Sequence, residues 1–102
     1  MVNSDNPVAV LYSDKTIFRK VCSYGEKPTA EEFREHYKVV CHFPPMSADE
    51  IYAELNLNPE KYIPELPEGI SHTSMSIGDV IDHREGKLIC TDIGWDALSF
   101  KE

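Results

Sequence analysis

The sequence is poor in basic residues and has no long hydrophobic run. Lysine and arginine total 10 of its 102 residues against 18 aspartates and glutamates, so the formal net charge is −8. A protein that binds nucleic acid or an anionic membrane directly carries the opposite balance, because its surface must neutralise phosphates. No segment approaches the ~20 consecutive apolar residues of a membrane-spanning helix. We therefore expect neither nucleic acid nor a membrane as a direct partner.

Cysteine is scarce as well, and its spacing excludes a disulfide-stabilised fold. Cys22, Cys41 and Cys90 are odd in number and far apart, whereas small disulfide-rich domains carry dense, even sets. The first residues contain no basic segment followed by a long apolar one, so no secretory signal is predicted. Both features indicate reduced thiols in a cytoplasm.

The motifs of catalysis, metal binding and phosphate binding are missing. The five glycines stand singly, so there is no glycine-rich phosphate loop. No C-x2-C, H-x3-H or G-x-S-x-G spacing is present. Cys41 and His42 are adjacent, which on a strand sends their side chains to opposite faces. We therefore predict no catalytic residues, no metal and no cofactor, and we place a minimal hydrolase built on Cys41 or Cys90 last.

What remains has the composition of a folded domain. Hydrophobic residues make up 41% and charged residues 27% of the chain, which is enough to bury a core. We predict a single α+β domain over residues 1–102, with a mostly antiparallel sheet of two β-hairpins and one further strand, and with two short helices. Residues 1–6 are expected to be a flexible N-terminus.

The strands are predicted from β-branched and aromatic runs. Val8–Tyr12 and Thr16–Tyr24 flank the short polar Ser13–Lys15, which predicts a hairpin. Residues Tyr37–Phe43 have little polarity and end at two prolines, which predicts a further strand. In the C-terminal third, Arg84-Glu85-Gly86 separates two apolar runs and predicts a second hairpin. Residues 97–100 suit either a last strand or a helical turn.

Two capping boxes predict the helices. Thr29 precedes Glu32 by three residues, and Ser47 precedes Glu50 in the same way. Each hydroxyl can therefore accept a hydrogen bond from the backbone amide of the glutamate. Beyond the second helix, residues 58–70 contain three prolines and a glycine, which predicts an irregular connector that opens with one helical turn at Pro59.

The C-terminal third carries a family resemblance. The run HTSMSIGDVI, from His72 to Ile81, is followed by Gly86 and by CTDIGW, from Cys90 to Trp95. It resembles the YodL-like small domains of bacteriophages and mobile genetic elements, in which such a segment leads into a hairpin that ends at an aspartate and a glycine–aromatic pair. The resemblance covers residues 71–100. It implies a phage or mobile-element origin, hence the cytoplasm of a bacterial host, and brings no activity with it.

This segment has two possible roles. Its short hydroxyl side chains and the Gly78-Asp79 pair suit turns in which side chains bond nearby backbone. Alternatively its polar groups contact a partner or a ligand, together with the tryptophan, which could lie in the core or in an exposed aromatic patch. The candidate contact residues are His72, Thr73, Ser74, Asp79 and Trp95.

The excess of acidic residues points to a second candidate surface. The predicted helices carry Glu31, Glu35, Asp49, Glu50 and Glu54. A carboxylate surface of this kind can imitate a nucleic-acid backbone and occupy a basic protein, and its plain alternative is solubility.

From these features we expect a non-enzymatic accessory protein that acts by binding another protein. The partner would be a host factor, which the acidic surface would inhibit, or a second copy in a homodimer joined at its sheet edges. The alternative is a small-molecule or nucleotide-binding domain that uses residues His72–Asp79.

Overall fold

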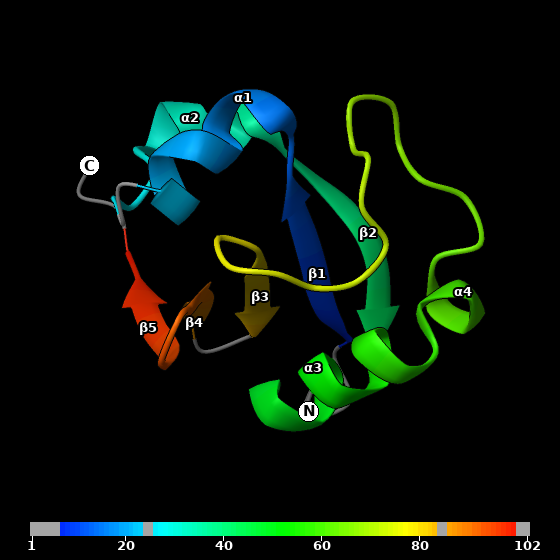
Figure 1. Ribbon diagram of the computed structural model, residues 1–102. Helices are drawn as coiled ribbons and strands as arrows, with labels where there is room; N and C mark the ends of the chain where they lie inside the picture. Colours follow the sequence, from blue (N-terminus) through cyan, green and yellow to red (C-terminus); the bar gives the residue numbers. More distant parts are fainter. Residues whose placement is uncertain (1–6, 24–25, 84–85, 100–102) are drawn as a thin grey trace.

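The structure is a computed structural model that describes residues 7–23, 26–83 and 86–99. Its strands form one antiparallel sheet in the order β2-β1-β3-β4-β5 (Figure 1). The strands are β1 (Val8–Ser13), β2 (Tyr37–Phe43), β3 (Val80–His83), β4 (Gly86–Thr91) and β5 (Gly94–Leu98). The predicted α+β class with an antiparallel sheet is therefore confirmed. The expected flexible residues 1–6 lie outside the described part of the chain.

The helices gather at two ends of the sheet. Near one end lie α1 (Lys15–Phe18), which runs directly into the π-helical segment η1 (Arg19–Ser23), and α2 (Ala30–His36). Near the other end lie α3 (Ala48–Leu57) and α4 (Pro59–Tyr62). Within the described residues, none of these helices has the length and apolar character needed to span a membrane.

Both predicted capping boxes are present. The Thr29 hydroxyl accepts from the Glu32 amide at 3.1 Å, and the Glu32 carboxylate accepts from the Thr29 amide at 2.9 Å. Ser47 and Glu50 make the same reciprocal pair at the start of α3. These local bonds satisfy amides that the first helical turn leaves free, which is why a four-residue pattern was enough to place the start of both helices.

The predicted N-terminal hairpin is wrong, because Thr16–Ser23 is helical and not a strand. Asp14 caps α1, its carboxylate accepting from the Ile17 amide at 3.1 Å. Ile17 and Val21 stand four apart and are both buried, so the segment packs with a helical period despite its β-branched residues. Tyr24, the expected end of that strand, lies outside the described residues.

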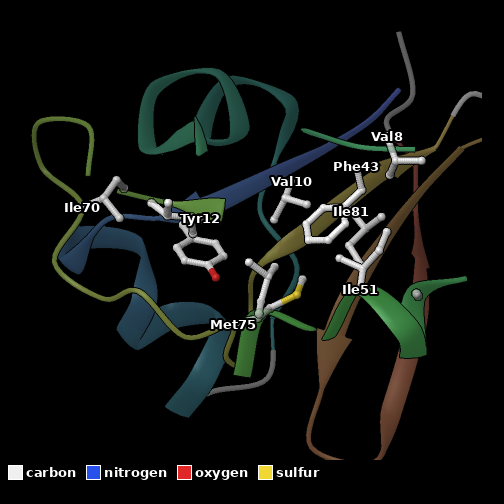
Figure 2. Close-up of a cluster of buried hydrophobic side chains, with 11 residues drawn as sticks. Val8, Val10, Tyr12, Phe43, Ile51, Ile70, Met75 and Ile81 are labelled. Carbon is white, nitrogen blue, oxygen red and sulfur yellow. The ribbon is translucent and has the colours of Figure 1, made fainter. Parts of the chain in front are cut away.

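The core lies on both faces of the sheet, because β1 is covered on each side. Its even-numbered residues Val8, Val10 and Tyr12 join α3 in one cluster (Figure 2), whereas Leu11 joins α1 and η1 in the other. Such alternation is the two-residue period of a strand.

A bulge lets β2 serve both clusters. Val10 pairs with Cys41 and Leu11 with Val39, so Val40 has no partner on β1. Tyr37 and Phe43 would share a face in a regular strand, but the extra residue sends them to opposite clusters.

The remaining connections agree with the predictions. Residues 58–70 are irregular after the helical turn α4, and buried Ile63 and Ile70 anchor them to the core. Strands β3 and β4 form the predicted C-terminal hairpin, with Arg84 and Glu85 outside the described residues. The choice left open for residues 97–100 is settled in part: β5 ends at Leu98 as a strand, and Phe100 is not described.

Candidate functional site

Asp79, just before β3, is a buried carboxylate with an exposed fraction of 0%. It accepts hydrogen bonds from the Ser13 amide at 3.0 Å, the Ser76 amide at 2.9 Å and Nε2 of His72 at 3.0 Å. The hydroxyls of the two serines stand at 3.5 and 3.3 Å. All these neighbours donate, which is what an acceptor-only carboxylate needs when water is excluded. Asp79 thereby ties the end of β1 to the loop that precedes β3.

Gly78 is required at its position by its backbone and by a close neighbour. Its φ of +96° is one that side-chain-bearing residues rarely adopt. A Cβ there would lie 2.5 Å from Cγ2 of Val21, at the point where η1 crosses the segment. The Gly78 carbonyl also accepts from the Tyr37 hydroxyl. Burial, and secondarily the charge of Asp79, raises the pKa of Tyr37 above its ordinary range, so this hydroxyl remains a donor.

His72 is held between Asp79 and Tyr12. Its ring stacks on the Tyr12 ring with centroids 4.6 Å apart and planes at 10°. The Tyr12 hydroxyl donates to the Thr73 carbonyl at 2.8 Å. Burial first, and then the Asp79 charge, raises the pKa of Tyr12 as well. Two flanking contacts therefore fix both the plane and the rotation of the imidazole.

The second ring nitrogen of His72 reaches solvent. Nε2 of His72 bonds to Asp79, and Nδ1 has no hydrogen-bond partner among the described residues. Every fully buried side-chain nitrogen or oxygen of the described residues does have a partner. Nδ1 is therefore not fully buried. The ring also borders a pocket of about 250 Å³, with Lys15 and Phe18 among the other lining residues.

The structure brings together only part of the predicted contact cluster. His72 and Asp79 bond each other, Thr73 provides a backbone acceptor, and Ser74 is exposed. Trp95 lies elsewhere, with its Nε1 donating to the Asp49 carboxylate at 2.9 Å. The turn-forming role therefore accounts for most of residues 72–79, because their polar groups are used within the fold.

The five predicted acidic residues are divided between two ends of the sheet. Glu31 and Glu35 lie on α2 and the other three on α3, and the seven-residue strand β2 separates the two helices. At about 3.3 Å per residue, that strand spans roughly 20 Å. All three α3 residues are also bonded within the fold: Asp49 to the Trp95 ring nitrogen, Glu50 in its capping box, and Glu54 to the Tyr62 hydroxyl at 2.7 Å.

A further candidate site lies where β4 turns into β5, and two of its residues, Trp95 and Asp49, were predicted from the sequence as parts of separate surfaces. A pocket of about 660 Å³ is bordered by η1 on one side and by the β4–β5 turn on the other. Ile93, in the two-residue turn, is 94% exposed. We call this surface the β4–β5 corner. It consists of Asp49, Tyr52, Asp92, Ile93, Trp95 and Asp96.

Trp95 is the centre of the corner. It is half-buried, packs against the core on its α3 side, and borders both the large pocket and a second hollow of about 200 Å³. The Tyr52 ring meets it edge-on with centroids 6.1 Å apart. One part of Trp95 therefore packs against the core, and another part lies at the surface next to Tyr52, where a partner could contact it.

The charges around the corner are mainly negative. Glu26, Asp92 and Asp96 border the large pocket, and Asp49 and Asp92 border the smaller one. The basic residue at this border is Lys27, whose Nζ lies 2.9 Å from the Ala97 carbonyl oxygen and 3.4 Å from the Asp96 carboxylate.

Cys41 and Cys90 lie in environments that do not activate their thiols. Burial, followed by the negative charge of Asp79, raises the pKa of Cys90 to about 11, and burial raises that of Cys41 to about 11. Both remain thiols at neutral pH, and a thiol is a poor nucleophile and a poor metal ligand. No group of three or more potential metal-ligating side chains occurs in residues 7–23, 26–83 and 86–99.

No family model, curated protein or solved structure matches the chain. The function is therefore inferred from the geometry of these residues, and the resemblance of residues 71–100 to YodL-like domains stays a prediction.

Proposed function

We propose that the protein is a non-enzymatic binding module whose β4–β5 corner recognises a basic, partly apolar segment of another protein. The observation that carries this proposal is the 94% exposure of Ile93 beside the half-buried Trp95. Burying an isoleucine side chain against a partner contributes about 1.5–3 kcal/mol. Tryptophan and tyrosine are enriched among the residues that dominate binding energy, and Tyr52 adjoins Trp95 here.

Charge indicates the kind of partner. Asp92 and Asp96 border the large pocket beside Trp95, Asp49 and Asp92 border the smaller hollow, and the whole chain carries a formal charge of −8. A basic partner would be attracted at long range and oriented at short range. Of the predicted acidic surface, Asp49 takes part, whereas the α2 glutamates are at the far end of β2.

The proposed biological setting follows from the resemblance. A phage or mobile-element origin for residues 71–100 favours a host protein as the partner and the cytoplasm of a bacterial cell as the place of action. A small acidic protein there would act by occupying a basic surface that its host partner uses for something else.

The experiment compares two exposed aliphatic residues. Ile93→Asp alters the corner, whereas Leu57→Asp alters a residue that is 74% exposed at the other end of α3. Each purified variant is used to capture proteins from a bacterial lysate at low and at high salt. We expect one protein to be retained by the wild type and by Leu57→Asp, to be lost with Ile93→Asp, and to be weakened by salt. Equal retention by all three variants, or no retained protein, would contradict the proposal.

A second candidate function rests on the solvent-facing nitrogen of His72. His72, Lys15 and Phe18 border the pocket of about 250 Å³, which suits a small ligand carrying both a hydrogen-bonding group and a ring. A nucleotide panel that raises the melting temperature of the wild type but not of His72→Gln would support this alternative. A panel without any such shift would remove it.

A further inference from the structure

Strand β5 is an open edge of the sheet. Among the described strands it pairs only with β4, as β2 at the opposite edge pairs only with β1. An edge strand presents backbone N–H and C=O groups that an extended segment of another chain can use. Two residues of the β4–β5 corner, Trp95 and Asp96, belong to this strand.

The register shows which groups of β5 point outward. Thr91 pairs with Gly94 across the two-residue turn, and the pair that flanks such a turn shares both hydrogen bonds. Pairs then alternate, so Asp96 bonds to β4 whereas Trp95 and Ala97 direct their N–H and C=O groups away from it.

Two observed contacts support this alternation. Cys90 lies opposite Trp95, and both of its backbone groups bond on the side of β3. Its N–H donates to the Asp79 carbonyl at 2.9 Å, and its C=O accepts from the Gly78 amide at 2.8 Å. The outward Ala97 carbonyl accepts from Lys27. The exposed edge is therefore defined by Trp95 and Ala97.

We infer that the partner is recognised by strand addition, in which a basic extended segment pairs with the outer edge of β5 and displaces Lys27 from the Ala97 carbonyl. This inference rests on the proposed function and specifies how the corner would engage its partner. Lys27 is easily displaced, because its side chain and that of Asp96 are 49% and 59% exposed and exposed ion pairs are weak. The Ala97 carbonyl would exchange an ammonium donor for a backbone N–H.

The opposite edge is a poorer template. The bulge at Val40 breaks the alternation of outward groups in β2, and such irregularities hinder the addition of a strand.

A second copy of the chain is a poorer occupant than a basic segment. Antiparallel pairing of two β5 edges around their centre would place Asp96 opposite Asp96 of the second copy, and like charges directly opposed are destabilising. A lysine or arginine of a basic segment at that position would instead meet a carboxylate, with Asp92 and Glu26 nearby on the same pocket border. Charge complementarity therefore selects the basic segment.

The test uses a synthetic peptide of alternating lysine and valine, with a glutamate–valine peptide as the charge control. We expect the amide protons of Trp95 and Ala97 to exchange rapidly in the free protein and slowly when the lysine–valine peptide is bound. The Asp96 amide, already bonded to β4, is the internal reference. Unchanged exchange at Trp95 and Ala97 in a peptide-saturated sample would overturn the inference, and this readout needs no variant.

A matched pair of variants adds an affinity readout. Ala97→Pro removes the outward N–H, which β4 does not use, and proline is tolerated at such edge positions. Ala97→Val keeps that N–H. We expect Ala97→Pro to raise the dissociation constant of the lysine–valine peptide about tenfold, Ala97→Val to leave it unchanged, and Lys27→Ala to lower it. Melting temperatures and circular dichroism establish that each variant is folded.

The outcomes separate this inference from the proposed function. If Ile93→Asp abolishes peptide binding and Ala97→Pro does not, the corner binds through side chains and strand addition is wrong. If the glutamate–valine peptide binds equally well, or if neither peptide binds, the basic partner and the strand addition both fail. A dimer of the wild type in sedimentation that Ala97→Pro dissociates would assign the edge to a second copy and overturn the choice of occupant.

Discussion

Replacing Asp79 should cost more stability than any other single polar substitution in the described chain. In Asp79→Ala, the buried amide of Ser13, the partly buried amide of Ser76 and the His72 ring lose their common acceptor. Each unsatisfied donor costs about 1–3 kcal/mol, so the loss of a shared acceptor by three donors is expected to cost at least about 3 kcal/mol. Set against a typical stability of about 5–15 kcal/mol, this loss could leave the alanine variant largely unfolded.

Asp79→Asn provides a graded version of the same test. The amide keeps one acceptor oxygen but turns the other into a donor that faces a donor, so we expect a loss of about 2–3 kcal/mol. The assay is urea unfolding followed by circular dichroism, with the slope of the transition compared between variants. Asp82→Asn is the control on β3, since its carboxylate is 37% exposed and 3.8 Å from Lys87, and it should cost less than about 1 kcal/mol. An asparagine variant as stable as wild type would refute the role assigned to Asp79.

Two further predictions concern the surroundings of this network. Gly78→Ala should lower the free energy of unfolding by about 2–3 kcal/mol, because it combines a φ of +96° with a Cβ that lies 2.5 Å from Val21, and urea unfolding measures it. The second is a pH effect: a hydrogen bond from Lys20, followed by one from the Thr29 amide, lowers the pKa of Glu32. Its contribution to stability is therefore present above the unfolded-state pKa, near 4.3, and is lost as the pH falls through the lower folded-state value. Lys20→Met should move the Glu32 titration seen by NMR back toward the ordinary value, and an unmoved titration would contradict the assignment.

The features that were predictable from the sequence are local ones. The capping boxes at Thr29 and Ser47 and the pairing of the neighbouring strands β3 and β4 are decided within short stretches of sequence, so short patterns identify them. The prediction of an N-terminal hairpin was wrong because β2 and β3, which come from distant parts of the sequence, occupy the positions on both sides of β1. With those positions filled, the buried faces of Ile17 and Val21 favour helix over their intrinsic strand preference.

The same distinction holds for the site. The pairing of His72 with Asp79 spans seven residues and was expected as a cluster, whereas the Ser13 contact spans 66 residues and no local pattern reveals it. The β4–β5 corner combines α3 with a turn from the C-terminal third. One signal for it was available: Ile93 is a large aliphatic residue between Asp92 and Gly94, in a position where polar or glycine residues are usual.

The most direct measurement of the central claim uses the fluorescence of Trp95, which is the single tryptophan of the 102-residue chain and the centre of the corner. The protein is titrated with the lysine–valine peptide and, separately, with the glutamate–valine peptide. We predict a saturable shift of the emission to shorter wavelength with the basic peptide only, weakened by salt and absent in Ile93→Asp. An emission spectrum that does not change with the basic peptide, or that changes equally with both peptides, would contradict the account.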